Sequence, residues 1–455
     1  MLEKITAAIN DALYGYVLII ILILAGLYFT VRTRFAQFRL LREQIKSVTE
    51  KPEGKNKVSS FQSLMVSTAS RVGTGNIVGV ATAICIGGFG SVFWMWIIAI
   101  IGGATAMIES TLAQIFKKKG PDGSYGGPAY YIEKGLKCRP LGIVFAVFLI
   151  ITYGFGFNML ASYNLQSTFK AYSFYDPKLS PWIIGLILAV TVGYCLLGGG
   201  KRIMKATGIL VPVMGVAYIL VAFIVTLLNI TALPDVFVRI FKGAFDLEAI
   251  FGGFSGSCVM YGIKRGLFSN EAGVGSAPNA AASADVEHPV KQGLVQTLSV
   301  FIDTMIVCSA TAFMCMCSGV PADKGLDGAA YVQTALSATL GGFGPIFITV
   351  AMVLFAFTTL IGNLYYVEQC FFYIIGRKTG KAFDICYRIA ASLIILLGAV
   401  LSAELLWNIA DITMGAMTLI NIPVICILGR YAIRALRDYE RQRNKERALF
   451  FQRTV

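Results

Sequence analysis

Long apolar stretches separated by shorter polar ones run through almost the whole chain. We distinguish eleven apolar segments, near residues 14–31, 62–87, 91–115, 140–164, 181–199, 206–228, 247–267, 290–317, 345–374, 385–405 and 408–429. The first, YGYVLIIILILAGLYFTV, has nearly the ~20 apolar residues that a helix needs to cross the hydrocarbon core of a bilayer. The pattern predicts an all-α polytopic membrane protein with eleven transmembrane helices.

Two of these segments are interrupted by glycines and polar residues: STASRVGTGNIVGVATAI at 67–84 and AIFGGFSGSCVMYGI at 249–263. Glycine allows the backbone to unwind, and the N–H and C=O groups that this releases cannot be satisfied by lipid. A broken helix is therefore expected to line a polar cavity. The alternative is that the glycines only permit close packing between helices.

The two interrupted segments stand at matching positions in the order of the segments. Without the first helix, ten segments form two sets of five, and each set opens with an interrupted one. Because five is odd, the sets cross the membrane in opposite directions, as an inverted repeat does. Interrupted spans at matching places indicate a transporter with its site near the midplane. We predict an N-terminal helix and loop (1–61), two five-helix repeats (62–228 and 229–429) and a basic tail (430–455).

Lysine and arginine are distributed unequally between alternate loops. Thirty-two of them lie in the loops 32–61, 116–139, 200–205, 264–291 and 377–388 and in the tail, six lie in the other loops and the N-terminus, and Arg71 lies inside a span. The positive-inside rule then places the N-terminus outside and the C-terminus in the cytoplasm. An odd number of spans requires the same arrangement.

Composition supports a membrane protein and argues against several functions. Apolar residues make up 56% of the 455 residues and charged residues only 14%, against about 25% in soluble proteins. The net charge of +14 is explained by topology, so we expect no nucleic-acid partner, and a lipid bilayer, that of the cell membrane, as the surroundings. One histidine, His288, and cysteines scattered through apolar runs offer no metal cluster or catalytic dyad. We expect no enzyme and no cofactor.

Three stretches resemble the alanine or glycine:cation symporter family: YGIKRGLFSNEAGVGSAPNAAASA (261–284), GTGNIVGVATAI (73–84) and FWMWIIAIIGGATAMIESTLA (93–113). The resemblance spans nearly the whole chain. It implies a leucine-transporter-like fold, with one N-terminal helix added to a 5+5 inverted repeat whose first and sixth core helices are discontinuous. It also implies import of a small neutral amino acid by alternating access, with sodium as the coupling ion. Substrate class and coupling ion come from the resemblance alone.

A zwitterionic amino acid needs an anion site, a cation site and a pocket for its side chain. The backbone N–H groups of Thr74 and Gly75 are candidates for the carboxylate, and the second break, Gly252–Ser257, offers carbonyls and serines for the ammonium, with Phe254 as one wall. Gln166 matches a substrate-contacting glutamine of the family, although a polar residue at the level of the headgroups is the alternative. The candidate substrate-binding residues are Thr74, Gly75, Asn76, Gln166, Gly253, Phe254, Gly256, Ser257, Thr359 and Asn363.

Sodium requires several oxygen ligands at short range. The resemblance implies the hydroxyls of Thr358 and Thr359 together with the backbone carbonyls of Ala69 and Val72. Asn76 could serve either sodium or the substrate. Adjacent threonines in a helix also commonly bond back to the preceding turn, which is the alternative for this pair.

Ionisable residues inside membrane spans are rare and usually functional. Arg71 is expected to pair with Glu109 in an inner gate, and Asp303 is a further gate candidate; a structural ion pair is an equally good explanation. Asp303 also keeps a proton-coupled transporter or exchanger as the main alternative. A channel is a weaker one, since no filter repeat or ring of charge is seen. Other charged residues of interest are Glu368 and Asp411 within spans and, at the water-accessible cytoplasmic end of the seventh, Lys264, Arg265 and Glu271.

The sequence departs from the family at Asn363. Alanine-transporting members carry tryptophan after the glycine of the threonine helix, whereas this chain has IGN. A carboxamide in place of an indole enlarges the pocket and makes it more polar. We therefore expect a longer polar amino acid, such as glutamine or serine, to fit as well as alanine.

Overall fold

The computed structural model describes residues 2–50, 57–120, 123–197, 199–246, 257–323, 325–326, 328–376 and 380–454. Most of these residues are helical. The two strands found in this part of the chain, β1 (Lys118–Gly120) and β2 (Gly123–Tyr125), form a short antiparallel hairpin in which Lys118 lies opposite Tyr125.

Several helices of the first half are joined end to end through a π-helical or 3-10 turn. These elements are α1 (Leu2–Ala12), η1 (Leu13–Val17), α2 (Leu18–Arg32), α3 (Ala36–Arg39), α4 (Leu41–Thr49), α5 (Ser60–Arg71), η2 (Gly75–Gly79), α6 (Val80–Gly87), α7 (Gly90–Ile115), α8 (Pro128–Leu136), α9 (Arg139–Leu149), η3 (Ile150–Gly156), α10 (Phe157–Ser167), η4 (Thr168–Ala171), α11 (Ser180–Leu196) and α12 (Gly199–Leu228).

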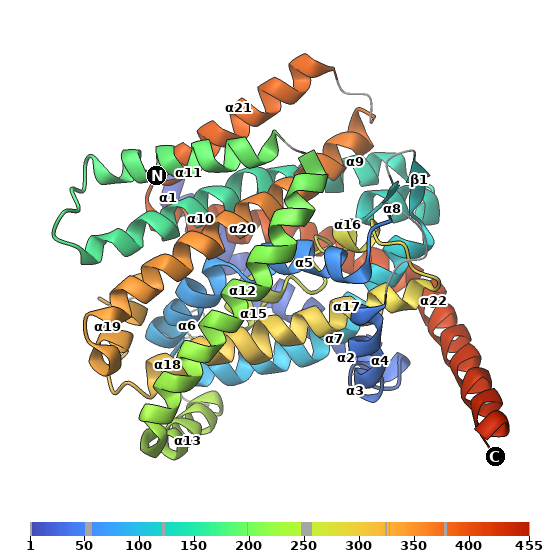
Figure 1. Ribbon diagram of the computed structural model, residues 1–455, viewed down its shortest axis with the longest axis horizontal. Helices are drawn as coiled ribbons and strands as arrows, with labels where there is room; N and C mark the ends of the chain where they lie inside the picture. The colour runs from blue at the N-terminus through green and yellow to red at the C-terminus, as the bar shows by residue number, and fades with distance from the viewer. Residues whose placement is uncertain are drawn as a thin grey trace.

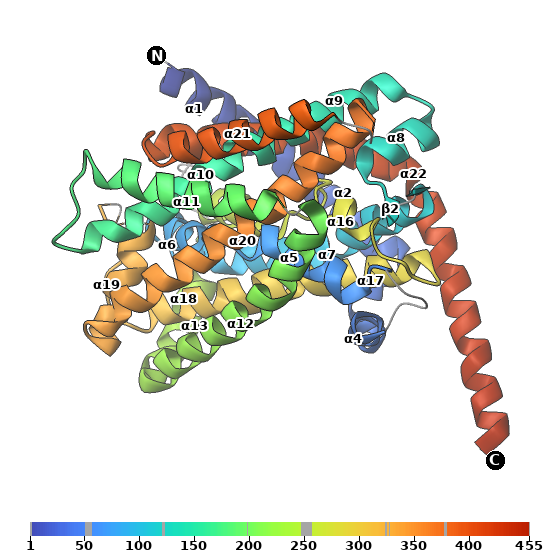
Figure 2. The ribbon, with the colours of Figure 1, turned by 45° about the horizontal axis from the view of Figure 1, so that its top comes forward.

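The second half has a similar make-up. It contains η5 (Ile230–Ala232), α13 (Leu233–Ala244), α15 (Cys258–Asn270), α16 (Pro278–Ala281), α17 (Pro289–Val300), η7 (Phe301–Cys308), α18 (Ser309–Met316), α19 (Gly328–Leu340), α20 (Phe343–Ile374), α21 (Lys381–Gly398) and α22 (Ala403–Thr454). The last of these is the longest, and its C-terminal part projects beyond the packed helices (Figure 1 and Figure 2).

Seven helices within the described ranges are long and apolar enough to cross a membrane: Ile5–Arg32, Gly90–Ile115, Arg139–Ala171, Arg202–Leu228, Pro289–Met316, Phe343–Ile374 and Ala403–Asn444. The bent pair Ser60–Arg71 and Gly75–Gly87 makes an eighth, and two shorter apolar helices, Ser180–Leu196 and Ile385–Gly398, occupy the predicted fifth and tenth segments. The multi-pass, all-helical class is confirmed. The count of eleven, the inverted repeat and its boundaries stay predictions, as does the orientation of the termini.

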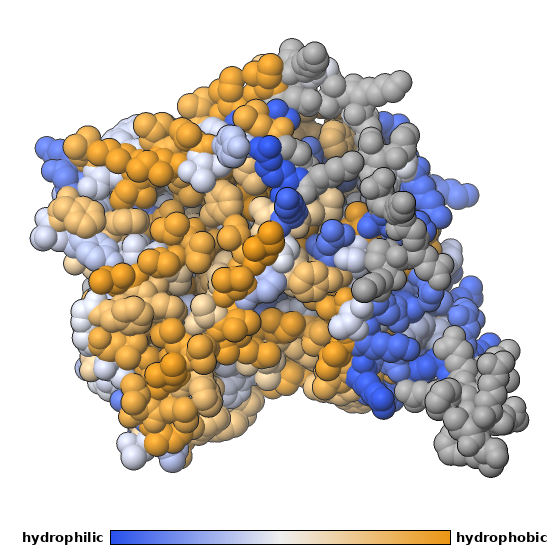
Figure 3. All heavy atoms as spheres, in the orientation of Figure 1, coloured by the Kyte–Doolittle hydropathy of each residue, from blue (hydrophilic) through white to orange (hydrophobic). Residues whose placement is uncertain are grey.

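The surface separates into an apolar body and a polar end. Large apolar side chains are exposed along the outer helices, among them Ile187 and Val190 on α11 and Val213 and Val216 on α12. Figure 3 shows this apolar surface over most of the visible face, with hydrophilic residues gathered at the end where α3, α4 and the projecting part of α22 lie. An exposed apolar surface of this extent is expected where lipid is the solvent.

The first interrupted segment contains a break in its helix. Helix α5 ends at Arg71, the backbone of Val72 leaves the helical conformation at φ −77° and ψ 87°, and the helix resumes after a bend of 50°. The second interrupted segment falls mostly on residues 247–256, so Gly253, Phe254 and Gly256 lie outside the described residues. Helix α15 begins just after them, with the Ser257 hydroxyl accepting a hydrogen bond from the Met260 N–H at 3.3 Å as its N-cap.

Close packing between α15 and α7 depends on Gly262. A Cβ at this position would lie 2.6 Å from Cβ of Trp94 and closer still to the carbonyl oxygen of Ser91. Because that carbonyl belongs to the backbone of α7, Gly262→Ala is expected to destabilise the protein by ~1–3 kcal/mol, seen as a lower midpoint of thermal unfolding in detergent. The matched control is Gly215→Ala on α12, whose Cβ would meet nothing within 4 Å. Equal midpoints for the two variants would contradict this packing.

Candidate functional site

Asn76, on η2 just after the break, links three elements. It is completely buried, and its Oδ1 accepts a hydrogen bond from the Gly73 N–H at 2.8 Å, which satisfies a backbone donor released by the break. Its Nδ2 donates to Oδ1 of Asp303 at 2.7 Å and to Oγ of Ser269 at 2.9 Å. The unwound backbone is thus held to η7 and α15 by a single carboxamide.

Asp303 lies at the centre of this group and is completely buried on η7. Besides Asn76, it accepts hydrogen bonds from the hydroxyls of Ser269 at 2.8 Å and Thr304 at 2.9 Å. No ion pair holds it within the described ranges. A buried carboxylate needs such donors, a proton or a cation, and here neutral donors surround it at the helix break.

Helix α20 crosses α5 at the same level. A Cβ on Gly73 would overlap Oγ1 of Thr359, and one on Gly362 would lie 2.9 Å from the Ser70 nitrogen. Oγ1 of Thr359 is buried and has no hydrogen-bond partner among the residues described. The hydroxyl of Thr358 instead donates back to the Leu354 carbonyl at 3.0 Å. The two neighbouring threonines therefore differ: one bonds to its own helix, and the other presents an unpaired oxygen to the broken backbone.

Asn363 lies one helical turn after Thr359. It is completely buried, donates to Oδ1 of Asn158 at 3.0 Å and accepts from the hydroxyl of Ser70 at 2.7 Å. The same hydroxyl lies 3.0 Å from Oε1 of Glu271. Asn363 therefore belongs to a buried polar network beside α5.

The expected ion pair between Arg71 and Glu109 is absent from this structure. Arg71 is buried and donates to Oε1 of Gln296 at 3.0 Å, while its Nε and Nη2 have no partner within the described ranges. Glu109 accepts from the Gly273 N–H at 3.3 Å and from Asn421 at 2.9 Å. The predicted pairing of Arg71 with Glu109 was wrong. Arg71 bonds instead to the carboxamide of Gln296 on α17, and the Glu109 carboxylate accepts hydrogen bonds from the Gly273 N–H and from Asn421 on α22.

A cavity of about 670 Å³ opens where α10, α19 and the start of α22 meet, on the predicted outer side. Its lining includes Asn164, Lys170, Lys264, Arg265 and Trp407. None of the predicted substrate-binding residues in the described part of the chain lines it. One lining residue contacts a predicted site residue: Nδ2 of Asn164 donates a hydrogen bond of 3.2 Å to Oγ1 of Thr74.

Gln166 also lies near this outer end, on α10. Its Oε1 accepts a hydrogen bond from the Tyr175 hydroxyl at 2.8 Å, and the residue is buried. The structure thus brings Asn76 and Asp303 together and Thr359 against the break, but leaves Gln166 apart from them, beside the cavity.

The ring of Phe268 lies between the broken backbone and one wall of the cavity. A Cβ on Gly75 would lie 2.7 Å from this ring, whose centre is 4.5 Å from that of Phe157 and 4.9 Å from that of Trp407, which lines the cavity. The ring therefore covers Gly75 on the side of Trp407. Sequence reasoning gave Phe268 no role; the signal was its place in the KRGLFSNEAG stretch.

The floor of the cavity carries a buried ionic cluster. Asp411 on α22 pairs with Lys264 at 2.9 Å and with Arg265 at 3.2 Å, and the Arg265 guanidinium lies 3.8 Å above the ring of Trp407. Lys264 and Arg265 were expected at a water-accessible cytoplasmic end. The side chains are instead 7% and 4% exposed, because α15 packs against α7 and α6 and both side chains reach Asp411 on α22.

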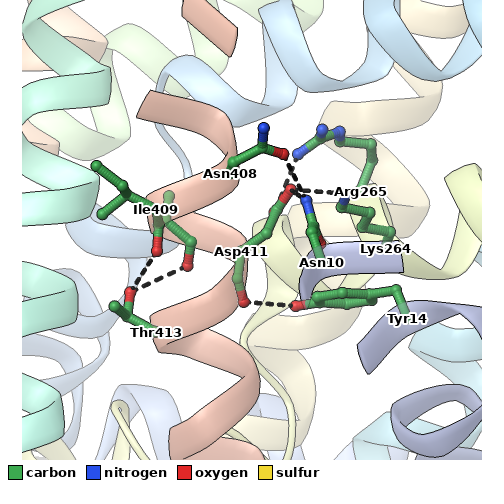
Figure 4. A network of polar contacts seen from close by, with 9 residues as sticks. Asn10, Tyr14, Lys264, Arg265, Asn408, Ile409, Asp411 and Thr413 are labelled. Atoms are coloured by element: carbon green, nitrogen blue, oxygen red, sulfur yellow. Dashed lines mark hydrogen bonds and ion pairs between the residues drawn. The ribbon is translucent and has the colours of Figure 1, made fainter. Parts of the chain in front are cut away.

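The N-terminal helix reaches this cluster (Figure 4). Nδ2 of Asn10 donates to Oδ1 of Asn408 at 2.8 Å and lies 3.4 Å from Oδ2 of Asp411, and the Tyr14 hydroxyl donates to the Asp411 carbonyl at 3.2 Å. The helix outside the predicted repeat therefore helps to hold α22 in place.

Comparison with known proteins adds to this geometry. Residues 1–453 match the sequence profile of the sodium:alanine symporter family. The chain is 45% identical to the amino-acid carrier protein AlsT of Bacillus subtilis over 96% of its own length and 92% of that protein. It is 43% identical to the probable sodium/glutamine symporter GlnT of the same organism, over 100% and 94% of the two chains. The crystal structure of MhsT in complex with L-phenylalanine superposes with a TM-score of 0.55 at 13% identity, covering 84% of this chain and 97% of that one. This last likeness confirms the leucine-transporter-like fold.

Proposed function

The chain belongs to the sodium:alanine symporter family, and we propose that it imports a small neutral amino acid together with sodium by alternating access. Family membership makes it an amino-acid:cation symporter in a membrane and not an enzyme. The observation that carries the sodium proposal is the hydroxyl of Thr359, a buried oxygen that faces the broken backbone at Gly73 and has no hydrogen-bond partner among the residues that the structure describes.

Sodium is proposed to bind between α5 and α20. Its ligands are the hydroxyls of Thr359 and Thr358 and the carbonyl oxygens of Ala69 and Val72, at the end of α5 where the helix stops. Such a set of neutral oxygens suits a hard cation. The contact of Gly362 with Ser70 supports the site, since it holds α20 close to these carbonyls.

The amino acid is proposed to bind at the break, with its carboxylate on the N–H groups of Thr74 and Gly75. Asn76, Thr359 and Asn363 border this region. Gln166, Ser257 and the residues of the second break remain proposed contacts of the substrate, of which Gln166 bonds to Tyr175 beside the cavity and Ser257 caps the start of α15. The ring of Phe268 now covers Gly75, so the ring has to move before a carboxylate can reach the backbone. We assign Phe268 to the outer closure and Arg71, Glu109 and Asp303 to the inner one.

The sodium gradient is sufficient for this task. One sodium ion moving down ~100 mV releases about 2.3 kcal/mol, and a tenfold concentration gradient adds about 1.4 kcal/mol. Their sum corresponds to accumulation of a neutral amino acid by about 500-fold.

Proton coupling is the second candidate, and one feature favours it. Three completely buried carboxylates, Glu109, Glu271 and Asp303, lie within the electrostatic reach of Arg71. They form no ion pair with it or with another cation among the described residues. Three buried negative charges around one positive charge are unfavourable unless a proton or a metal cation joins them.

Uptake of labelled alanine and glutamine into proteoliposomes tests both candidates. An inward sodium gradient is compared with an equal potassium gradient, and each is repeated with and without an inward proton gradient. Accumulation that requires sodium supports the proposed function. Accumulation driven by the proton gradient without sodium would replace it with the second candidate, and uptake indifferent to both gradients would contradict both.

The substrate preference is expected to depend on Asn363. Asn363→Trp should lower the ratio of glutamine uptake to alanine uptake by about tenfold, because an indole leaves less space and less polarity at this position. A tenfold change corresponds to about 1.4 kcal/mol of discrimination between the two substrates. The initial rates of the two substrates in proteoliposomes give the ratio. Since Asn363 also bonds to Asn158 and Ser70, Asn158→Ala serves as the control for loss of the network. An unchanged ratio in Asn363→Trp would remove Asn363 from specificity.

A further inference from the structure

The turn that follows the first membrane span holds an arginine where a glycine is usual. Helix α2 ends the span at Arg32. The Phe35 N–H then donates to the Thr30 carbonyl at 2.9 Å, and the Arg34 N–H donates to the Val31 carbonyl at 3.0 Å. In this pattern of hydrogen bonds the residue after the helix adopts the left-handed conformation that glycine favours. Here that residue is Arg34, with φ 58°.

The residue after Arg34 is left-handed as well, since Phe35 has φ 56°. A Cβ is unfavourable in this conformation. Both side chains are exposed, so packing inside the protein does not compensate for the strain. The turn therefore holds a guanidinium and an aromatic ring next to each other on the surface, directly after a membrane span.

Helix α4, which begins one short helix later, has three faces. At 100° per residue, its exposed residues form an apolar row, Leu41 and Ile45, beside a basic row, Arg42 and Lys46. Leu41 and Ile45 are 46% and 54% exposed. The third face, which includes Gln44, is buried, and α4 packs against α17 and α5. Adjacent apolar and basic rows are typical of a helix that lies on a membrane surface.

The place of this segment in the fold decides what meets the two rows. Helices α3 and α4 lie at the edge of the helical body in both ribbon views (Figure 1 and Figure 2). Because the apolar span ends at Arg32, the residues that follow it lie at the level of the lipid headgroups. The side chains of Phe35, Leu41 and Ile45 can then enter the acyl-chain region, while the basic side chains reach the phosphates.

Most charged side chains around this turn are already matched. The ion pairs are Arg39 with Glu440 at 2.6 Å, Arg443 with Glu43 at 3.9 Å and Lys291 with Glu50 at 2.7 Å. Lys46 lies within electrostatic reach of Glu287. Arg34 and Arg42 are both exposed and form no ion pair within the described ranges. These two guanidiniums therefore remain for an anion from outside the protein.

We propose that residues 34–45 bind an anionic phospholipid, with Arg34 and Arg42 donating to its headgroup and Phe35, Leu41 and Ile45 against its acyl chains. A guanidinium suits phosphate oxygens, because it donates charge-assisted hydrogen bonds in a planar fork. The apolar row selects a lipid over a dissolved anion, since only the lipid brings acyl chains to it. Neither the amino acid nor sodium takes part in this site.

The test places a fluorescent reporter in the turn of the full-length protein, as Phe35→Trp, and reconstitutes the protein in vesicles. Quenching by brominated phosphatidylglycerol is compared with quenching by brominated phosphatidylcholine, and the protein with Phe35 intact gives the background of the four native tryptophans. The reporter is expected to prefer phosphatidylglycerol. One basic residue near an anionic surface corresponds to about a fivefold gain in affinity. Arg34→Gln combined with Arg42→Gln should therefore lower the preference about 5- to 25-fold.

The matched control is Arg434→Gln combined with Arg437→Gln, which removes two exposed arginines from α22 and should keep the preference. Arg34→Gly separates binding from stability. Glycine adopts φ 58° without strain, so this variant should unfold at no lower a temperature than wild type and still show a weaker preference.

Four results would each overturn the lipid site. They are equal quenching by the two lipids in the reporter protein, an unchanged preference in Arg34→Gln with Arg42→Gln, an equal loss in the control, and displacement of phosphatidylglycerol by inorganic phosphate. The last result would assign the arginines to a dissolved anion. A lower unfolding temperature of Arg34→Gly with an unchanged lipid preference would make Arg34 structural and would overturn its part in the site.

Discussion

Thr359→Val is expected to abolish sodium-driven uptake of alanine and to leave the sodium-free protein as stable as wild type or slightly more so. Oγ1 of Thr359 is buried and forms no hydrogen bond within the described part of the chain, so replacing it with a methyl group of similar shape breaks none of the hydrogen bonds seen there. The same change removes a proposed sodium ligand. Removing a group that only orients a metal ligand typically lowers metal affinity or activity by about 10- to 100-fold. Removing a ligand itself should therefore lower sodium-driven uptake by at least about 100-fold.

Two measurements check this expectation: initial rates in proteoliposomes, and the midpoint of thermal unfolding with and without sodium. Sodium at 100 times its dissociation constant should stabilise wild type by about 2.7 kcal/mol, and this stabilisation should be largely absent in Thr359→Val. Thr418→Val is the matched control, since Thr418 is also buried and its hydroxyl donates back to the carbonyl of Met414 in its own helix. A variant that keeps the sodium-induced rise in midpoint would remove Thr359 from the sodium site.

Asp411→Ala is expected to destabilise the protein strongly in every buffer. It leaves Lys264 and Arg265 buried without their shared carboxylate. Loss of one partner from a buried ion pair typically costs about 3–5 kcal/mol. The expected result is a much lower midpoint of thermal unfolding in detergent and a reduced yield of folded protein.

The control for this variant is Asp235→Ala, which removes a carboxylate that is 71% exposed and 4.0 Å from Arg239. Such a surface pair contributes about 0–1 kcal/mol to the free energy of unfolding, so the midpoint of thermal unfolding of Asp235→Ala should hardly differ from that of wild type. Lys264→Gln combined with Asp411→Ala should recover part of the loss, because one buried cation rather than two is then unpaired. An Asp411→Ala variant as stable as the control would show that water or other groups already neutralise the cluster.

Much of the general architecture was predictable from local patterns. The apolar stretches are long enough to cross a membrane and can be recognised from residue type alone. They therefore predicted a helical membrane protein. The break after Arg71 was predictable because GTGN combines conformational freedom with polar groups that lipid cannot satisfy. The position of Asn76 beside that break followed from the same stretch.

The partners of individual polar side chains were not predictable, because they depend on which helix faces meet. Arg265 and Asp411 are 146 residues apart, and the length of the spans does not reveal that α15 and α22 meet there. The pairing of Arg71 with Glu109 failed for the same reason, since Gln296 and Asn421 come from other helices. The sequence also could not separate Thr358 from Thr359, which differ only in the direction of each hydroxyl around α20.

The sequence by itself therefore determined the class of protein, the family and the place where the first broken helix unwinds, all of which arise from residue type and local order along the chain. Only the tertiary structure decided that Thr359 faces the break, that the ring of Phe268 covers Gly75, and that Asp411 pairs with two cations and contacts the N-terminal helix. These features arise from the packing of distant helices, where the crossing of two backbones decides which groups are left without a partner.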